Sequence, residues 1–421
     1  MAEIKIESRE ELIYLLSEAA EIEHGVACSY LFAAFSMKSD VSEGVTEQQL
    51  EAIGRWKGVL LRVAGQEMAH LTLASNMLTA IGAAPQLRRP NFPAGSGYYP
   101  EGFAIVASAF NEATLQHFLF IERPEGMELD DGVVYHSPGR PHPDPVVSSD
   151  VTAEPRAFAT IGELYHAIED GFRHLCEKLG AETLFIGPPK AQATDEYFSF
   201  KEVVPVTDLQ SAIEAIETIV EEGEGARGDW ENAHYGQFLT IQQQYQQMLA
   251  DDPDFVPARP VLANPFTRVP SDAPDANVID DPFSVEVCDL FDDCYELMLL
   301  MLARFFAHTE ETQAELKALA GTAVDVMFAA IEPLGNMITT LPAGPSHPGL
   351  NAGPGFHFFR TLHTLPHRHA AWTIFLERLA ELSRYAAALG GRPQAPAVLA
   401  EVSGALDGLR GKLAAAIEST D

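Results

Sequence analysis

With 421 residues, 47% of them apolar, the chain is long enough for two domains that each bury a core. Its formal net charge of −34 argues against nucleic acid and membrane surfaces as main partners, because both are negatively charged and the sequence has no compensating basic patch. The N-terminal segment MAEIKIESREELIYLL has acidic residues where a secretory signal has basic ones, and apolar runs such as LMLLMLARFF are too short to span a bilayer. We therefore expect a cytoplasmic protein, with its four cysteines reduced.

Helical periodicity dominates the first 250 residues, so the predicted fold class is all-α. A long segment rich in proline and glycine follows the second helix and contains one helix of its own. Two helix pairs joined by a long crossing have the connectivity of a ferritin-like four-helix bundle. The predicted helices span 8–37, 46–82, 104–121, 152–179, 207–222 and 229–250.

The rest of the chain divides into a linker and a second helical region. Residues 251–281 are rich in proline and aspartate, which is typical of a linker, and residues 282–421 contain amphipathic helices. The predicted domains are therefore 1–250, 251–281 as the linker, and 282–421. We expect the C-terminal region either to shape the substrate pocket of the bundle or to form a homodimer. Its histidines are irregularly spaced and predict a solvated surface; they are His357, His363, His367 and His369.

Glu67 and His70 lie on an apolar face of the second predicted helix. Leu60, Val63 and Leu71 recur on the same face at helical spacing. A buried carboxylate is costly unless a basic residue or a metal ion pairs with it. The pair therefore indicates a metal site or a buried ion pair.

The pattern Glu-x-x-His occurs once in each main helix, whereas composition alone would give about one occurrence in total. In the fourth helix, Glu231 and His234 share an apolar stripe with Phe238, so this pair faces the core as Glu67 and His70 do. In the first helix the residue on the apolar stripe is Glu23, which is a better candidate ligand than the Glu-x-x-His pair of that helix. The four pairs are Glu21/His24, Glu67/His70, Glu163/His166 and Glu231/His234.

The third helix offers two candidates. Glu169 shares an apolar side with Tyr165 and Phe172, so periodicity favours Glu169. Glu163 lies on the other side, and it forms a capping box with Thr160 if the helix begins there.

Collected, the candidates are one glutamate from each of two helices and Glu-x-x-His from each of the other two. This is the known ligand set of ferritin-like di-iron and di-manganese proteins. Carboxylates bridge two cations and each imidazole binds one, so mixed nitrogen and oxygen donors suit iron first and manganese as the alternative, whereas zinc fits less well. Tyr30, seven residues after Glu23, lies on the same face, where it either bonds an oxygen ligand of the metals as a catalytic residue or simply packs.

A family resemblance is carried by five segments: EIEHGVACSYLFAAFSMK, QEMAHLTLASNMLTAIGA, TIGELYHAIEDGF, VPVTDLQSAIEAIETIVEEGEG and ENAHYGQFL. They resemble the ferritin-like domain of the iminophenyl-pyruvate dimer synthase type. That domain is found in enzymes of bis-indole pigment pathways, such as violacein assembly, and in stand-alone bacterial proteins. The resemblance continues into MFAAIEPLGNMITTLPAGPSHPGLNAGPGF and favours Glu163 over Glu169. The predicted metal ligands are then Glu23, Glu67, His70, Glu163, Glu231 and His234.

These observations predict an oxidoreductase with two metal ions. The reduced centre would take up O2 or peroxide, and the oxidised centre would remove electrons from a small organic substrate, which the resemblance suggests is derived from an amino acid. One alternative is an iron-binding ferroxidase, which the long C-terminal region disfavours because it does not fit a closed shell. Another is a non-catalytic structural protein stabilised by metal.

Overall fold

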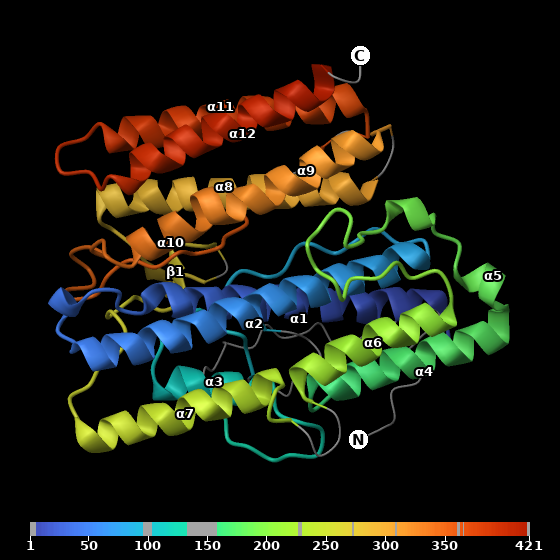
Figure 1. The fold of residues 1–421 in the computed structure, drawn as a ribbon, viewed down its shortest axis with the longest axis horizontal. Coiled ribbons are helices and arrows are strands. Elements are labelled where there is room, and N and C mark those ends of the chain that lie inside the picture. The colour runs from blue at the N-terminus through green and yellow to red at the C-terminus, as the bar shows by residue number, and fades with distance from the viewer. Residues whose placement is uncertain are drawn as a thin grey trace. The chain divides into compact units, whose positions relative to one another are not determined.

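The computed structural model describes residues 6–95, 103–132, 158–225, 230–271, 273–307, 310–359, 363–364 and 366–418, and the structural statements below concern these residues. The chain forms two compact units. The first comprises Met1–Val106, Phe110–Ala193 and Phe200–Ala258, and the second comprises Ala107–Ala109, Thr194–Ser199 and Arg259–Asp421 (Figure 1). Helices dominate both units, which confirms the predicted all-α fold class.

Two uninterrupted helices form one half of the first unit. Helix α1 spans Arg9–Ser36 and α2 spans Glu47–Ala80, and a short 3₁₀ turn, Val41–Glu43, lies between them. Each helix begins with a capping box, in which the cap side chain and the third helical residue bond each other's backbone amides. The caps are Ser8 and Thr46. The two helices pack against each other along their lengths.

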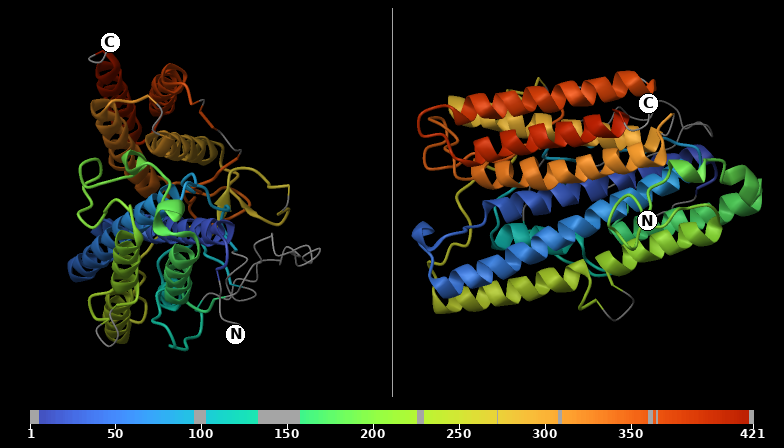
Figure 2. Two further views of the ribbon diagram at one scale, coloured as in Figure 1. Left: turned by 90° about the vertical axis from the view of Figure 1, so that its right-hand side faces the viewer. Right: turned by 45° about the horizontal axis from the view of Figure 1, so that its top comes forward.

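The other half of the bundle consists of two rows of helices, and each row is interrupted near its middle. Figures 1 and 2 show α3 and α4 following each other along one row and α6 and α7 along the other. Helix α3 packs against α7, and α4 packs against α6 and α1. The chain crosses from the end of α2 to the far end of the bundle before α3, which confirms the long crossover. The bounds are Glu112–Ile121 for α3, Ile161–Leu179 for α4, Leu209–Gly223 for α6 and His234–Asp251 for α7; the short α5, Ala181–Leu184, and a 3₁₀ turn, Pro189–Ala191, follow α4.

Three predicted helix limits differ from the structure because of these interruptions. The helix predicted over 104–121 begins only at Glu112, since Ile105 pairs with Ala94 in an extended bridge. The helix predicted from 152 begins at Ile161, after the cap Thr160, and residues 152–157 lie outside the described part. The helix predicted from 229 begins at His234.

The second unit contains the remaining helices. Helix α8 spans Pro282–Ala307 and α9 spans Gln313–Val326; a π-helical segment, Met327–Ile331, joins α9 to α10, Glu332–Ile338. Pro333 has no amide hydrogen, which accounts for the change of helical register just before it. Helices α11, Arg368–Gly390, and α12, Val398–Glu418, pack against each other. Two short parallel strands, β1 (Pro265–Phe266) and β2 (Asn277–Val278), complete the unit.

Part of the predicted linker belongs to this second unit. From Arg259 onward the segment buries Leu262, Phe266 and Ile279, whose side chains are at most 7% exposed. His357 is also buried, because Asp292 bonds its ring at 3.1 Å and Phe266 stacks on it. The prediction of a solvated surface is therefore wrong for this histidine.

The stretch Gln313–Ile338 is the one described helix that is long and apolar enough to cross a membrane by length and composition. Half of its most apolar window is buried inside the structure, as expected for a helix that packs in a protein core. This feature gives weak evidence for a membrane span.

Candidate metal centre

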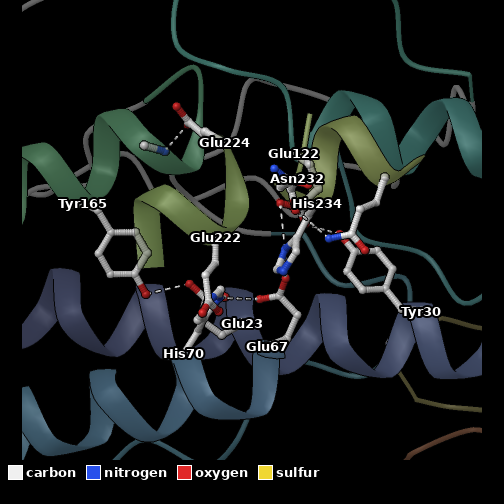
Figure 3. Close-up of polar contacts among 12 residues, drawn as sticks. Glu23, Tyr30, Glu67, His70, Glu122, Tyr165, Glu222, Glu224, Asn232 and His234 are labelled. Carbon is white, nitrogen blue, oxygen red and sulfur yellow. Dashed lines mark hydrogen bonds and ion pairs between the residues drawn. The ribbon is translucent and has the colours of Figure 1, made fainter. Parts of the chain in front are cut away.

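A cluster of carboxylates and imidazoles lies in the first unit, at the level where the two helix rows are interrupted. Glu222 is part-exposed, and the other members are at most 5% exposed. Burial of this many ionisable groups together is costly unless cations pair with the carboxylates. The members are Glu23 from α1, Glu67 and His70 from α2, Glu122 directly after α3, Glu222 from the last turn of α6, and His234 from the start of α7 (Figure 3).

Five of these residues form two overlapping groups. In each group the candidate ligand atoms lie within 4.8 Å of one another, which is close enough for one metal ion to contact all of them. One group is Glu23, Glu67 and His70; the other is Glu67, Glu122 and His234. Glu67 belongs to both, and its two carboxylate oxygens point to different imidazoles: Oε2 lies 3.1 Å from Nδ1 of His70, and Oε1 lies 2.8 Å from Nδ1 of His234. Glu67 is therefore placed as a carboxylate shared by two metal positions.

Each outer carboxylate receives a hydrogen bond from a buried tyrosine. The hydroxyl of Tyr165 in α4 donates to Oε1 of Glu23 at 2.6 Å, and the hydroxyl of Tyr30 in α1 donates to Oε1 of Glu122. Both tyrosines are fully buried. The two halves of the cluster thus repeat one pattern of tyrosine, carboxylate and imidazole around the shared Glu67 (Figure 3). The structure brings the predicted catalytic residue Tyr30 to the cluster, and its catalytic role stays a prediction.

The two imidazoles differ on the side that faces away from Glu67. Nε2 of His70 lies 3.1 Å from Oε2 of Glu222. Nε2 of His234 is buried and has no hydrogen-bond partner among the described residues. Because metal-binding histidines usually donate their other ring N–H to an acceptor, Glu222 is placed to orient His70.

Burial and mutual charge shift the pKa values of the cluster strongly. Burial, together with repulsion from Glu67, raises the pKa of Glu23 to about 8. Burial would also raise the pKa of Glu67, but the imidazoles of His234 and His70 hold it below its usual value. Burial alone would lower the pKa values of both imidazoles; the carboxylate of Glu67 outweighs it, raising the pKa of His234 to about 9 and that of His70 well above its usual value. Without metal, both imidazoles and Glu23 therefore carry a proton at neutral pH.

Glu224 joins the helix ends around the cluster. Its carboxylate, just after α6, accepts the backbone N–H of Gly162 in α4 at 2.7 Å and that of Glu125 at 3.0 Å. A Cβ atom on Gly162 would lie 2.2 Å from Oε1 of Glu224, so this contact requires glycine. The segments TIGELY and EEGEG, which carry much of the family resemblance, meet at this contact.

We expect Gly162→Ala to lower the free energy of unfolding by about 1–3 kcal/mol, because the added methyl group pushes Glu224 away from the amides that it binds. The matched control is Gly58→Ala in α2, where a Cβ atom has nothing within 4 Å. That change should raise the stability by up to about 1 kcal/mol through helix propensity. Denaturant unfolding followed by circular dichroism measures both. Equal stabilities of the two variants would contradict the tight contact.

Two of the predicted ligands lie outside the cluster. Glu163 is in the first turn of α4, where its carboxylate accepts the N–H of Ala159 at 2.7 Å and its own N–H donates to Thr160, so it caps the helix. Glu231 is exposed in a bend before α7. Glu169, the alternative to Glu163, pairs with Arg173. The assignment of Glu231 assumed a helix that begins at residue 229, whereas α7 begins at His234. The assignment of Glu163 came from the family resemblance, and the residue forms the cap with Thr160 that the sequence also indicated.

Sequence reasoning missed three members of the site: Glu122, Glu222 and Tyr165. Glu122 directly follows the apolar run LFI at the end of α3, and Glu222 precedes the helix-ending GEG. An acidic residue at the end of an apolar helix was the available signal. It carries weight only once the helix is known to stop at that residue.

Comparison with known proteins gives one family match and two curated relatives. A ferritin-like family model matches residues 16–243. The chain is 28% identical over 384 residues to dichlorochromopyrrolate synthase of Lentzea aerocolonigenes, covering 83% of this chain and 36% of that protein. It is 27% identical over 368 residues to 2-imino-3-(indol-3-yl)propanoate dimerase of Chromobacterium violaceum, covering 83% of this chain and 34% of that protein. The chain thus spans about a third of the length of these relatives.

One solved structure, a ferritin-like protein from Caulobacter vibrioides, matches with a TM-score of 0.47 and 17% identity. The match covers 75% of this chain and 94% of that one.

Proposed function

Since the chain belongs to the ferritin-like family, whose model matches more than half of its length, we propose that it is a di-metal oxidoreductase acting on a small amino-acid-derived substrate. The observation that carries the proposal is Glu67, which faces one imidazole with each of its carboxylate oxygens. The resemblance to ferritin-like dimer synthases is confirmed by the two curated relatives. Both of those relatives are enzymes by name.

We propose Glu23, Glu67, His70, Glu122 and His234 as the metal ligands. Glu122 thereby takes the place that sequence reasoning gave to Glu163, and Glu231 has no counterpart in this set. Three carboxylates and two imidazoles suit iron, with manganese as the alternative, since both accept mixed nitrogen and oxygen donors. The surplus of buried carboxylates also fits a site completed by cations. When bound, two such ions supply Lewis acidity and redox capacity.

The protein's own residues hold the ligands and their protons in place. Tyr165 and Tyr30 donate to Glu23 and Glu122, which fixes which oxygen of each carboxylate is free. The aromatic rings of Phe118 and Phe238 pack around Tyr30 and exclude water from that side. Excluding water lowers the local dielectric constant, which strengthens the electrostatic interactions within the centre.

For the substrate, we propose a 2-imino or 2-oxo acid with an aromatic side chain. Support comes from the dimerase relative, whose name states that its substrate is 2-imino-3-(indol-3-yl)propanoate. Joining two such molecules through one new carbon–carbon bond releases two protons and two electrons. Dioxygen takes these up to form hydrogen peroxide, or hydrogen peroxide takes them up to form two water molecules. Because the chain spans about a third of that relative, we propose the substrate class and the two-electron oxidation rather than the relative's product.

The proposal is tested by the metal content and the oxidase activity of the full chain purified without oxygen. We expect about two iron or manganese ions per chain. We also expect consumption of dioxygen when an aromatic 2-oxo acid is supplied together with an ammonium salt, with which it forms its imine in equilibrium, and none when the metals are removed by a chelator. A chain that binds no metal after reconstitution would contradict the proposal. A metal-loaded chain that consumes no dioxygen or peroxide with any such acid would leave a structural metal protein in its place.

A further inference from the structure

Helix α2 carries one row of side chains that leads from solvent to the proposed centre. Arg62, Gln66 and His70 follow one another at intervals of four residues, so they share one face of the helix. Arg62 is exposed, Gln66 is part-buried and His70 is buried. Glu222, in the last turn of α6, lies 3.1 Å from Nε2 of His70. Gln237, in the first turn of α7, accepts a hydrogen bond from Arg62 at 2.9 Å. The row therefore passes the interruption between α6 and α7 (Figure 1).

Solvent reaches the centre on the same side. Glu222 is 27% exposed, whereas the other members of the cluster are at most 5% exposed. The helix surface next to Arg62 is also open. If Gly58 or Gly65 carried a Cβ atom, no described atom outside the adjoining helix backbone would lie within 4 Å of it. This face of α2 is therefore the side from which a small molecule reaches the centre.

The guanidinium of Arg62 has no carboxylate partner among the described residues; it donates to the neutral amide of Gln237. The residues three and four positions away on α2 are Gly58, Val59, Gly65 and Gln66. None of these is acidic, although 61 of the 421 residues are aspartate or glutamate. A guanidinium has five N–H donors in a planar fork that matches a carboxylate. Arg62 therefore offers an anion site next to a centre that is rich in negative charge.

Gln66 offers a second polar group one turn closer to the centre. Its side-chain nitrogen approaches the carboxylate of Glu222, so its oxygen, Oε1, remains for another contact. Oε1 is buried and has no hydrogen-bond partner within the described ranges. A buried acceptor without a donor is costly, so a ligand that brings an N–H group to Oε1 gains binding free energy.

We propose that Arg62 and Gln66 recognise the substrate: Arg62 binds the carboxylate of the 2-imino acid, and Oε1 of Gln66 accepts the N–H of its imino group. These two groups are on neighbouring carbon atoms of the acid, and the two side chains are on neighbouring turns of α2. The assignment rests on the substrate class of the proposed function. It also explains how a chain with a formal net charge of −34 holds an anionic substrate beside buried carboxylates.

The experiment measures binding without turnover, by isothermal titration calorimetry of the full chain loaded with Mn²⁺ and kept without oxygen. The probes are phenylpyruvate and its methyl ester, which lacks the negative charge. Arg62→Gln should weaken the binding of phenylpyruvate about tenfold and leave that of the ester unchanged. The matched control is Arg55→Gln, at an exposed position of the same helix, which should change neither. Circular dichroism and metal analysis confirm that the variants keep their fold and their metal.

The role of Gln66 is tested with L-phenylalanine, whose ammonium group carries N–H donors at the carbon next to the carboxylate. Gln66→Leu should weaken the binding of L-phenylalanine by about tenfold, because it removes the acceptor. It should leave the binding of phenylpyruvate, which has no N–H group, unchanged. An equal effect on both probes would contradict the contact with the imino group.

Equal effects of Arg62→Gln and Arg55→Gln, equal effects of Arg62→Gln on acid and ester, or no binding of phenylpyruvate by the unmodified chain would overturn the inference. The proposed function is decided separately, by metal content and dioxygen consumption. A chain that consumes dioxygen with an unchanged KM for the acid in Arg62→Gln would keep the proposed function and lose this recognition site. A chain whose binding of phenylpyruvate depends on Arg62 but that consumes no dioxygen or peroxide would keep the site and lose the oxidase.

Discussion

Replacing Glu67 with alanine is expected to remove both metal ions, lowering the metal content from about two ions to fewer than about 0.2 per chain. The physical reason is that Glu67 faces both imidazoles, so neither position keeps a complete set of ligands. Oxidase activity should fall at least about a hundredfold as a result. Metal analysis and dioxygen consumption measure the two effects. The isosteric Glu67→Gln variant, whose fold is checked by circular dichroism, separates metal loss from unfolding.

The controls for Glu67→Ala are Glu163→Ala and Glu231→Ala. Both residues were predicted as ligands from the sequence, and the structure places one in a helix cap and the other on the surface. We therefore expect both variants to keep their metal, whereas Glu122→Ala should lose it at one position. Loss of metal from Glu163→Ala or Glu231→Ala, with Glu122→Ala unaffected, would show that the sequence-based ligand set is correct.

Metal affinity should rise steeply with pH. Glu23, His70 and His234 each carry a proton near neutral pH, and all three must lose it before they bind a metal ion. Because three protons are released, the overall binding constant for two metal ions should rise by up to about a thousandfold per pH unit around pH 6 to 7. The slope should decrease above about pH 8, where Glu23 is already ionised. Competition with a chelator of known affinity, measured with Mn²⁺ across this range, gives the slope.

The thermal stability of the metal-free protein should change in the opposite direction and decrease as the pH rises. The folded-state pKa values of Glu23 and His234, about 8 and about 9, lie above the usual values of 4.5 and 6.5. Groups with raised pKa values stabilise the fold while protonated, and this stability is lost as the pH rises through the folded-state values. The melting temperature without metal should therefore fall between about pH 7 and pH 9. A metal-free melting temperature that rises over this interval would contradict the charge arrangement of the cluster.

Much of the site in the first two helices could be predicted from the sequence. Glu23, Glu67, His70 and Tyr30 lie in α1 and α2, which continue without interruption, so a period of 3.6 residues places their side chains correctly. The all-α class and the long crossover follow from the same regular pattern.

In the other half of the site, His234 was predicted from the same periodicity, but Glu122 and Glu222 could not be predicted in this way. Helical periodicity predicts the direction of a side chain only if the helix continues without a break. Both helix rows are interrupted at the level of the cluster. Glu163 and Glu231 lie beyond these stops, whereas Glu122 and Glu222 lie just before them. The Thr160 cap marks the start of α4 locally, but the bond of Glu224 to Gly162 joins segments that are distant in the sequence, and no local pattern reports that bond.

The interruptions also change the electric field at the centre. Every peptide unit carries a dipole, and the sum along a helix gives about half a positive charge at its start and half a negative charge at its end. In an uninterrupted bundle a mid-helix site lies far from both ends. Here the carbonyl ends of α3 and α6 and the amide ends of α4 and α7 all lie beside the centre. The backbone itself thus provides partial negative charge from the ends of α3 and α6 and partial positive charge from the starts of α4 and α7.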